Sequence, residues 1–293
     1  MMKLLCTDLD RTLLPNGAQP ESPDARALFS RFVANSGCHL AYVSGRHLSL
    51  VKHAIKEYAL PQPDFAITDV GARIYRYEDE LWHNDKHWQE EIDKNWAVHG
   101  RAFICGVFDS FSELTLQENE KQSTHKISFY HHADIDLQGL QRQIEDRLAR
   151  YTIEVSMIWS HDDLTGQGLL DVLPRSASKY HAISFLADIL SVGLDQVVFA
   201  GDSGNDLEVL CSEIPSVLVA NASAEVRDMA QAMVQENGHP TQLYLAHGGL
   251  PGEDLSGEGL QGMNGNYSAG ILEGVLYYHP DMKRFIESGA EVT

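Results

Sequence analysis

Two apolar runs far apart in the chain each end in a cluster of aspartates. They are Leu4–Thr7, followed by Asp8 and Asp10, and Val197–Ala200, followed by Asp202 and Asp206. Short runs rich in Val, Leu and Phe predict strands buried in a parallel sheet, and ligands of such sheets bind beyond the carboxyl ends of the strands. Four aspartates gathered there would repel one another by about 4 kcal/mol per close pair at an effective dielectric constant of 20. A hard cation such as Mg²⁺ is therefore expected between the two clusters.

Charge and cysteine content narrow the class of protein. The chain carries 42 acidic and 22 basic residues, a formal charge of −20. This balance argues against binding to nucleic acid or to an anionic membrane surface, both of which call for basic patches. The apolar stretch at the N-terminus is cut short by Asp8, so we expect no signal peptide, and no apolar run has transmembrane length. The four scattered cysteines contain no CxxC pair and favour a reducing compartment, so we predict a cytoplasmic enzyme.

The order of predicted elements indicates a doubly wound α/β core with an insertion. The core strands are expected at Lys3–Thr7, His39–Val43, Phe65–Thr68, Leu169–Leu173, Gln196–Ala200 and Ser216–Val219. From about residue 80 to residue 168 the chain is richer in Trp, His, Gln and charge, and its strand signals are shorter. We therefore predict a Rossmann-like parallel-sheet core made of residues 1–79 and 169–293, and an inserted α+β cap of residues 80–168.

The aspartates near the N-terminus suit phosphoryl transfer. A carboxylate nucleophile with a neighbouring carboxyl acid and base can divide the reaction into two steps. Asp8 would attack phosphorus, and Asp10 would protonate the leaving oxygen and later deprotonate the hydrolytic water. Such transfers need positive charge, for which Mg²⁺, Lys179 and Arg46 are the candidates. Ser44 and Gly45, at the end of the second strand, offer a hydroxyl and free backbone N–H groups for phosphate.

In this order the elements resemble the four motifs of the haloacid dehalogenase superfamily of phosphohydrolases. The matching residues are Asp8-x-Asp10-x-Thr12, Ser44, Lys179 and Gly201-Asp202-Ser203-Gly204-Asn205-Asp206. The resemblance implies a magnesium site made of Asp8, the Asp10 carbonyl, Asp202 and Asp206, and we assign Asn205 to substrate or phosphate binding. Members of this superfamily often have Gly where this chain has Arg11.

An insertion between the second and third motifs is the layout of members with the larger α+β cap, subfamily IIB. Within that group the chain looks like sucrose-phosphate phosphatases, on the segments Ala41–Arg46, Asp64–Tyr75, His125–Phe129, Asp171–Pro174 and Ser268–Ile271. The resemblance implies a sugar phosphate substrate, first of all sucrose 6-phosphate. Mannosyl-3-phosphoglycerate and mannosylfructose phosphate are alternative substrates. A non-catalytic partner of a sugar-phosphate synthase is an alternative of another class, and a synthase is also a candidate partner of the enzyme.

Two basic residues and one loop have more than one interpretation. Arg46 is either a phosphate ligand or an exposed residue at a helix start, and Lys126 is either a sugar contact in the cap or a surface strand residue. The cap is expected to choose the sugar, because every catalytic candidate lies outside it. The glycine-rich stretch Gly248–Gly265 is predicted to be a surface loop, since it lacks the strand and lysine of a nucleotide-binding loop.

Overall fold

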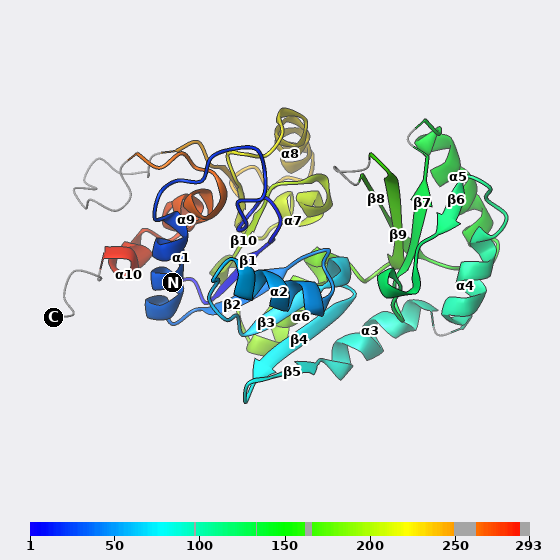
Figure 1. Ribbon diagram of the computed structural model, residues 1–293, viewed down its shortest axis with the longest axis horizontal. Helices are drawn as coiled ribbons and strands as arrows, with labels where there is room; N and C mark the ends of the chain where they lie inside the picture. The colour runs from blue at the N-terminus through cyan, green and yellow to red at the C-terminus, as the bar shows by residue number, and fades with distance from the viewer. Residues whose placement is uncertain (97, 133, 162–165, 249–261, 288–293) are drawn as a thin grey trace.

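The computed structural model describes residues 1–96, 98–132, 134–161, 166–248 and 262–287, and its strands form two separate sheets (Figure 1). The larger sheet has the order β12-β11-β10-β1-β2-β3-β4-β5. Neighbours from β12 to β3 run parallel, and β4 and β5 complete one edge antiparallel. Its strands are β1 (Leu4–Thr7), β2 (His39–Val43), β3 (Phe65–Thr68), β4 (Arg73–Glu78), β5 (Leu81–Asn84), β10 (Val197–Gly201), β11 (Ser216–Leu218) and β12 (Leu243–Leu245). The doubly wound core that the sequence predicts is thus confirmed.

Helices cover both faces of this sheet. Successive residues of a strand point to opposite faces, and here the residues on both faces are apolar and need to be covered. Leu4 and Cys6 of β1 pack in the cluster that includes α6, α7 and α8, whereas Leu5 packs in the cluster that includes α1, α2 and α9. Burial on both faces explains why the central strands are apolar throughout. The helices of the core are α1 (Ala25–Ser36), α2 (Leu48–Glu57), α6 (Lys179–Leu190), α7 (Leu207–Leu210), α8 (Ala224–Glu236), α9 (Tyr267–Tyr278) and α10 (Arg284–Glu287).

The smaller sheet has its own apolar core. Its antiparallel strands lie in the order β6-β7-β9-β8, and their inner residues pack with those of α3, α4 and α5. Figure 1 shows this body, in green, beside the larger one, with α3 running from the end of β5 towards it. The elements are α3 (Lys86–Trp96), α4 (Gly100–Phe108), β6 (Leu114–Leu116), β7 (Ile127–His131), α5 (Leu137–Ala149), β8 (Val155–His161) and β9 (Gly168–Pro174).

One predicted core strand belongs to the smaller sheet. The sequence predicts Leu169–Leu173 as a strand of the parallel core, but β9 pairs antiparallel with β7 and β8. The assignment was wrong because an apolar run does not show which sheet its edges will pair with. At the other boundary, β5 pairs with β4 in the larger sheet. We propose that the cap spans residues 85–174 rather than 80–168, so that each sheet lies within one domain.

Two further features of the described residues bear on the sequence predictions. No helix among them combines the length and apolar character needed to cross a membrane. All four cysteines are free thiols. Most of the glycine-rich stretch, residues 249–261, lies outside the described residues, so the loop predicted there stays a prediction.

Candidate active site

Three adjacent strands of the larger sheet end in polar residues at one edge. Asp8 follows β1, Asp202 follows β10, and Ser44 follows β2. Strand β1 pairs with both neighbours in register, so these ends meet as the sequence predicts. Asp8 and Asp202 are 5% and 3% exposed. The edge of the sheet therefore holds a buried acidic cluster.

Lys179, the first residue of α6, brings a positive charge into this cluster. Its Nζ donates to Asp8 Oδ1 at 3.1 Å, to Asn205 Oδ1 at 2.9 Å and to Asp206 Oδ1 at 2.6 Å. The side chain is about 1% exposed, and although burial alone would lower the lysine pKa, Asp206 and Asp8 together hold it above its usual value. All three ammonium protons are thus used, and the lysine stays charged between two carboxylates.

Lys179 reaches the site by a route that the sequence analysis did not foresee. A lysine that follows the predicted core strand Leu169–Leu173 would lie at the carboxyl edge of the core sheet, but the strand that precedes it, β9, lies in the smaller sheet. The start of α6 instead packs against the turn after β3. Gly71, with φ 101°, lies so close to Ser178 that a Cβ there would be 2.4 Å from the Ser178 carbonyl. A glycine at this position lets the turn fix the entry of α6, whose first turn is capped by the Ser178 side chain.

Asp206 is anchored by its own chain. Its Oδ2 accepts hydrogen bonds from the backbone N–H groups of Asp202 and Ser203, at 3.1 Å each, and from the Ser203 hydroxyl at 3.2 Å. The Asp206 side chain folds back so closely onto residue 201 that this residue must be glycine, because a Cβ there would lie 2.6 Å from the Asp206 carboxyl carbon. Asp206 therefore sets the geometry of the Gly201–Asp206 turn as well as accepting from Lys179.

The three buried aspartates form a group that fits a divalent cation. Asp8, Asp202 and Asp206 each offer an oxygen within 4.8 Å of the others. Within the described cluster, Asp202 Oδ2 is buried and accepts no hydrogen bond, while Oδ1 accepts from the Thr12 hydroxyl at 3.0 Å. Burial and the charge of Asp206 raise the pKa of Asp202 to about 7, and burial also raises the pKa of Asp8 despite Lys179. Crowded, poorly solvated carboxylates with an oxygen to spare are the donor set that Mg²⁺ prefers.

Asp10 lies apart from this group, and its carboxylate is held by Arg46. Arg46 Nε donates to Asp10 Oδ2 at 2.7 Å, and the Nη2 group donates to Oδ1 at 2.6 Å. The amide of Asn16 adds a third hydrogen bond to Oδ1 at 2.7 Å. Asp10 is therefore not in the carboxylate group that could hold a metal, and a contribution through its carbonyl oxygen stays a prediction. Arg46 contacts the predicted acid and base directly.

The predicted phosphate contacts occupy the neighbouring turns. Ser44 is 1% exposed, and its Oγ accepts from the Arg46 N–H at 3.2 Å. Gly45 lies in the same turn, where a Cβ would meet only Val70 at an ordinary 3.7 Å. Asn205 uses its amide oxygen to accept from Lys179. Asn205 thus supports the lysine, and its predicted contact with substrate is an additional role that stays a prediction.

Lys126 connects the two bodies of the molecule. It lies just before β7, it is 8% exposed, and its Nζ is 3.6 Å from Asp69 Oδ1 and 4.0 Å from Asp171 Oδ2. Asp69 belongs to the turn after β3, whose backbone is tied to the Ser44–Arg46 turn. The alternative of an exposed surface lysine is therefore wrong, and the ammonium group faces the junction between cap and core.

Four residues near the site were not predicted as functional. Thr12 donates to Asp202, Asn16 donates to Asp10, Arg11 Nε lies 3.5 Å from Asp202 Oδ2, and Asp69 pairs with Lys126. Thr12 stands in the first motif, so its position was a usable signal. Arg11 lies in the same motif and Asp69 in the segment Asp64–Tyr75, whereas Asn16 lies outside every motif, and for all three only the folded chain shows the partner.

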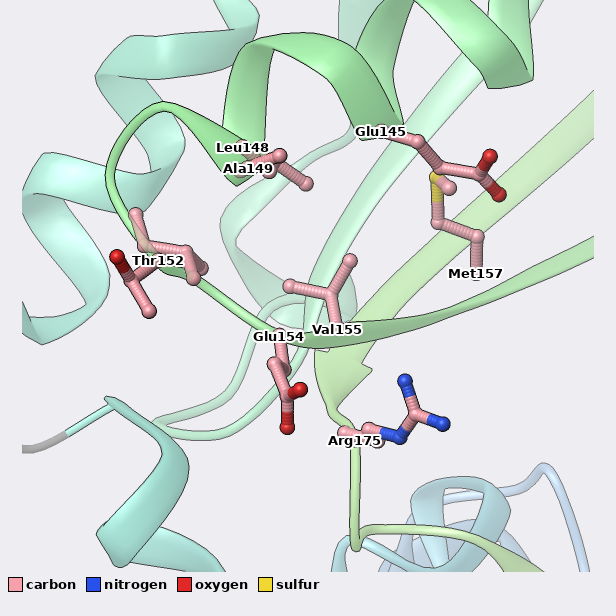
Figure 2. Close-up of a pocket in the computed structure, with 9 residues that line it drawn as sticks. Glu145, Leu148, Ala149, Thr152, Glu154, Val155, Met157 and Arg175 are labelled. Carbon is pink, nitrogen blue, oxygen red and sulfur yellow. The ribbon is translucent and has the colours of Figure 1, made fainter.

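A separate cavity of about 390 Å³ lies in the cap, between the end of α5, strand β8 and the return to the core (Figure 2). Its lining includes Glu145, Met157, Glu154 and Arg175. None of the predicted site residues lines this cavity, and the acidic cluster lies elsewhere.

Comparison with known proteins places this geometry in a family. The model of the sucrose-6F-phosphate phosphohydrolase family matches residues 1–250. The chain belongs to this family. It is accordingly a phosphoric monoester hydrolase of the haloacid dehalogenase type, as the motifs predicted.

Individual relatives agree with the family assignment. A protein from Nitrosococcus oceani described as a HAD-like hydrolase is 46% identical over 98% of this chain and 75% of its own length. The mannosylfructose-phosphate phosphatase of Agrobacterium fabrum is 30% identical over 78% of this chain and 87% of its own length. The chain spans about half the length of the plant sucrose-phosphatases that it matches, 54% in the first enzyme from Nicotiana tabacum.

The fold also matches a solved structure. The sucrose-phosphatase from Synechocystis sp. PCC6803, solved with sucrose and phosphate, aligns with a TM-score of 0.73 over 95% of this chain and 98% of that protein. The two sequences are 24% identical. The likeness shows that the two proteins share their fold.

Proposed function

We propose that this protein hydrolyses a sugar phosphate monoester, sucrose 6-phosphate first of all, in a reaction that depends on Mg²⁺. The observation that carries the proposal is the buried contact of Lys179 with Asp8 and Asp206 at the end of β1, next to Asp202. Burial raises the pKa of Asp8, and the charge of Lys179 opposes this rise, so the lysine favours the ionised, nucleophilic form of the carboxylate. The family match supplies the class of substrate.

In this proposal each side chain has a distinct part. Asp8 attacks phosphorus and becomes an aspartyl phosphate, while Asp10 gives a proton to the departing sugar oxygen. Asp10 then takes a proton from the water that hydrolyses the intermediate, and Asp8 is released. Ser44 and the N–H groups of its turn hold the phosphate oxygens, and Lys179 balances their charge. A magnesium ion bound by Asp8, Asp202 and Asp206 would add positive charge at the phosphoryl group.

The cap is proposed to choose the sugar. Lys126 presents a buried ammonium at the junction of the two bodies, where an ionic hydrogen bond to a sugar hydroxyl is worth most. Mannosylfructose phosphate is the second candidate substrate, since the Agrobacterium fabrum relative is named for it. Mannosyl-3-phosphoglycerate, a synthase partner and a cytoplasmic location stay predictions from the sequence alone.

Replacing the nucleophile tests the chemistry. Asp8→Asn keeps an oxygen that can accept from Lys179 but cannot form the acyl phosphate, so turnover should fall by more than about a thousandfold. Activity is measured with p-nitrophenyl phosphate, and the fold by circular dichroism. Asp188→Asn, on the exposed side of α6, is the matched control and should turn over like the wild type. Near-normal turnover by a sequence-verified Asp8→Asn protein would refute the mechanism.

Specificity constants test the substrate. Values of kcat/KM are compared for sucrose 6-phosphate, mannosylfructose phosphate, mannosyl-3-phosphoglycerate and p-nitrophenyl phosphate, each with Mg²⁺ and with excess chelator. We expect sucrose 6-phosphate to lead and chelation to stop turnover. Equal hydrolysis of all four esters would contradict a disaccharide substrate, and full activity in chelator would contradict the metal.

A further inference from the structure

The hydrogen bonds that Arg46 makes differ from those expected of a phosphate ligand. A phosphate ligand would present the forked edge of its guanidinium to the phosphate oxygens. Here Nε and the Nη2 group, which form one such fork, both donate to Asp10, at 2.7 and 2.6 Å. The fork is therefore already matched to a carboxylate of this chain.

The Asp10 carboxylate accepts three hydrogen bonds in return, which leaves one lone-pair site of Oδ2 for the proton. Oδ2 accepts from Arg46, and Oδ1 accepts from both Arg46 and Asn16. Two donors from Arg46 and one from Asn16 approach the carboxylate from different sides, so its plane has little freedom to rotate. This matters because the Asp10 side chain is 41% exposed, and packing alone would not hold it in place.

Arg46 is itself held by a rigid turn. Its N–H donates to Ser44 Oγ at 3.2 Å, and its carbonyl accepts from the Asp69 N–H at 3.1 Å. Its side chain is 22% exposed, about half as much as that of Asp10. The orientation of Asp10 is thus set by the turn after β2, on the far side of β1 from the strand that carries Asp202.

We propose that Arg46 is a positioning residue, which fixes the Asp10 carboxylate for its proton transfers, rather than a ligand of the phosphate. The inference rests on the proposed function, because it assumes that Asp10 is the acid and base. Asn16 also helps to position the Asp10 carboxylate, through one hydrogen bond and therefore more weakly.

The step that depends on this orientation is hydrolysis of the aspartyl phosphate. The water oxygen forms a bond to phosphorus, and the bond between phosphorus and the Asp8 oxygen breaks. One water proton passes to Asp10, which had given its own proton to the leaving sugar oxygen in the first step. A carboxylate that rotates freely would seldom face the water, so the loss falls on rate and not on binding.

Arg46→Ala tests the proposal by separating rate from affinity. The measurements are kcat and KM for p-nitrophenyl phosphate, the inhibition constant of inorganic phosphate, and the decay of acid-quenched, ³²P-labelled protein after a chase. We expect kcat and the decay rate to fall about ten- to a hundredfold, the effect of losing a charged hydrogen bond. KM should fall with kcat, because slower hydrolysis of the covalent intermediate lowers both, and the inhibition constant of phosphate should change little. A phosphate ligand would instead raise KM and the inhibition constant together and leave the decay rate unchanged, which would overturn the proposal.

Two milder variants keep the test decisive if Arg46→Ala fails to fold. Arg46→Lys keeps the charge but loses the fork, and should recover part of the lost rate. Asn16→Ala removes one of three donors and should slow decay less than Arg46→Ala. Arg26→Ala removes an arginine from another carboxylate pair, with Glu21 at 2.6 Å, and serves as the control with wild-type kinetics. Normal decay in both Arg46→Lys and Asn16→Ala would also overturn the proposal.

Different results would refute the proposed function and the positioning role of Arg46. If a sequence-verified Asp8→Asn protein turns over p-nitrophenyl phosphate at a near-normal rate, the proposed function is wrong in its mechanism. If the wild type forms the label and the Arg46 variants lose it at the normal rate, the proposed function stands and the positioning role is wrong.

Discussion

Arg11 combines an unusual backbone conformation with a charge beside the metal group. Its φ is 59°, in the left-handed region that costs a non-glycine residue about 1–2 kcal/mol. Asn221, which is 2% exposed, donates to the Arg11 carbonyl at 2.6 Å and supports this conformation. The side chain then lies with Nε 3.5 Å from Asp202 Oδ2. A glycine at this position would adopt the same conformation without this cost.

Arg11→Gly should strengthen magnesium binding. The change removes a cation that competes for Asp202, and the half-exposed pair is worth about 0.2–1 kcal/mol, so the dissociation constant should fall by up to about fivefold. Isothermal titration of the metal-free protein with Mg²⁺ gives the constant. Arg11→Lys keeps the charge and should bind as the wild type does. Weaker binding by the glycine variant would show that Arg11 helps to hold the metal.

The raised pKa of Asp202 predicts how the stability of the metal-free protein depends on pH. The folded protein binds this proton more tightly than the unfolded chain, whose value is near 3.8, so stability falls as pH rises from there to about 7. The raised pKa of Asp8 acts in the same direction. Urea unfolding from about pH 5 to pH 8 should show this loss in chelator and a smaller loss in excess Mg²⁺. Asp202→Asn should flatten the profile, and an unchanged slope in that variant would contradict the assignment.

At the scale of elements, α9 anchors the end of the larger sheet through a buried carboxylate. Glu273 is 2% exposed and accepts from the Tyr244 hydroxyl at 2.8 Å and from the N–H groups of His247 and Gly248 at 3.1 Å each. Gly265 lies close to the backbone of Gly248, because a Cβ at residue 265 would be 2.6 Å from the Gly248 nitrogen. One side chain thus joins β12 to both ends of the glycine-rich stretch.

Glu273→Ala should lower the free energy of unfolding by about 2–3 kcal/mol, because two backbone N–H groups and a hydroxyl lose their acceptor in a buried place. Denaturant unfolding monitored by circular dichroism measures the change. Glu225→Ala, on the exposed first turn of α8, should alter stability by less than about 0.5 kcal/mol. If Glu273→Ala also lowers the free energy of unfolding by less than about 0.5 kcal/mol, water replaces the carboxylate without cost.

At the scale of the whole molecule, the two sheets meet around Lys126. The lysine precedes a cap strand, and its carboxylate partners lie one in the core turn, Asp69, and one in the cap sheet, Asp171. Neither distance is that of a hydrogen bond, so the ammonium group keeps donors for a ligand. This arrangement supports the proposal that the cap recognises the sugar and the core carries out the phosphate chemistry.

Lys126→Ala should therefore affect substrates unequally. We expect KM for sucrose 6-phosphate to rise about ten- to a hundredfold, and KM for p-nitrophenyl phosphate to change little, since the latter has no sugar. Lys121→Ala, an exposed lysine of the same cap segment, is the control and should leave both constants unchanged. An equal rise for both esters would place Lys126 at the phosphate and not at the sugar.

The local sequence determined the core strands, the acidic clusters and the order of the motifs. Leu4–Thr7 and Val197–Gly201 are buried on both faces, as is typical of strands in the interior of a parallel sheet. The carboxyl ends of such strands share an edge, so the strand pattern by itself places Asp8, Asp202 and Ser44 together. Lys179 was also expected at this edge, although for a reason that the fold corrects.

Only the tertiary structure decided which partners these residues take. Strand β9 joins the smaller sheet because its edges pair with β7 and β8, and no pattern within Gly168–Pro174 specifies that choice. Arg46 lies on Asp10, and Arg11 lies beside Asp202, because turns from distant parts of the chain meet at one edge of the sheet. Periodicity within a segment reports which of its faces is buried, whereas contacts between segments depend on how the whole chain packs.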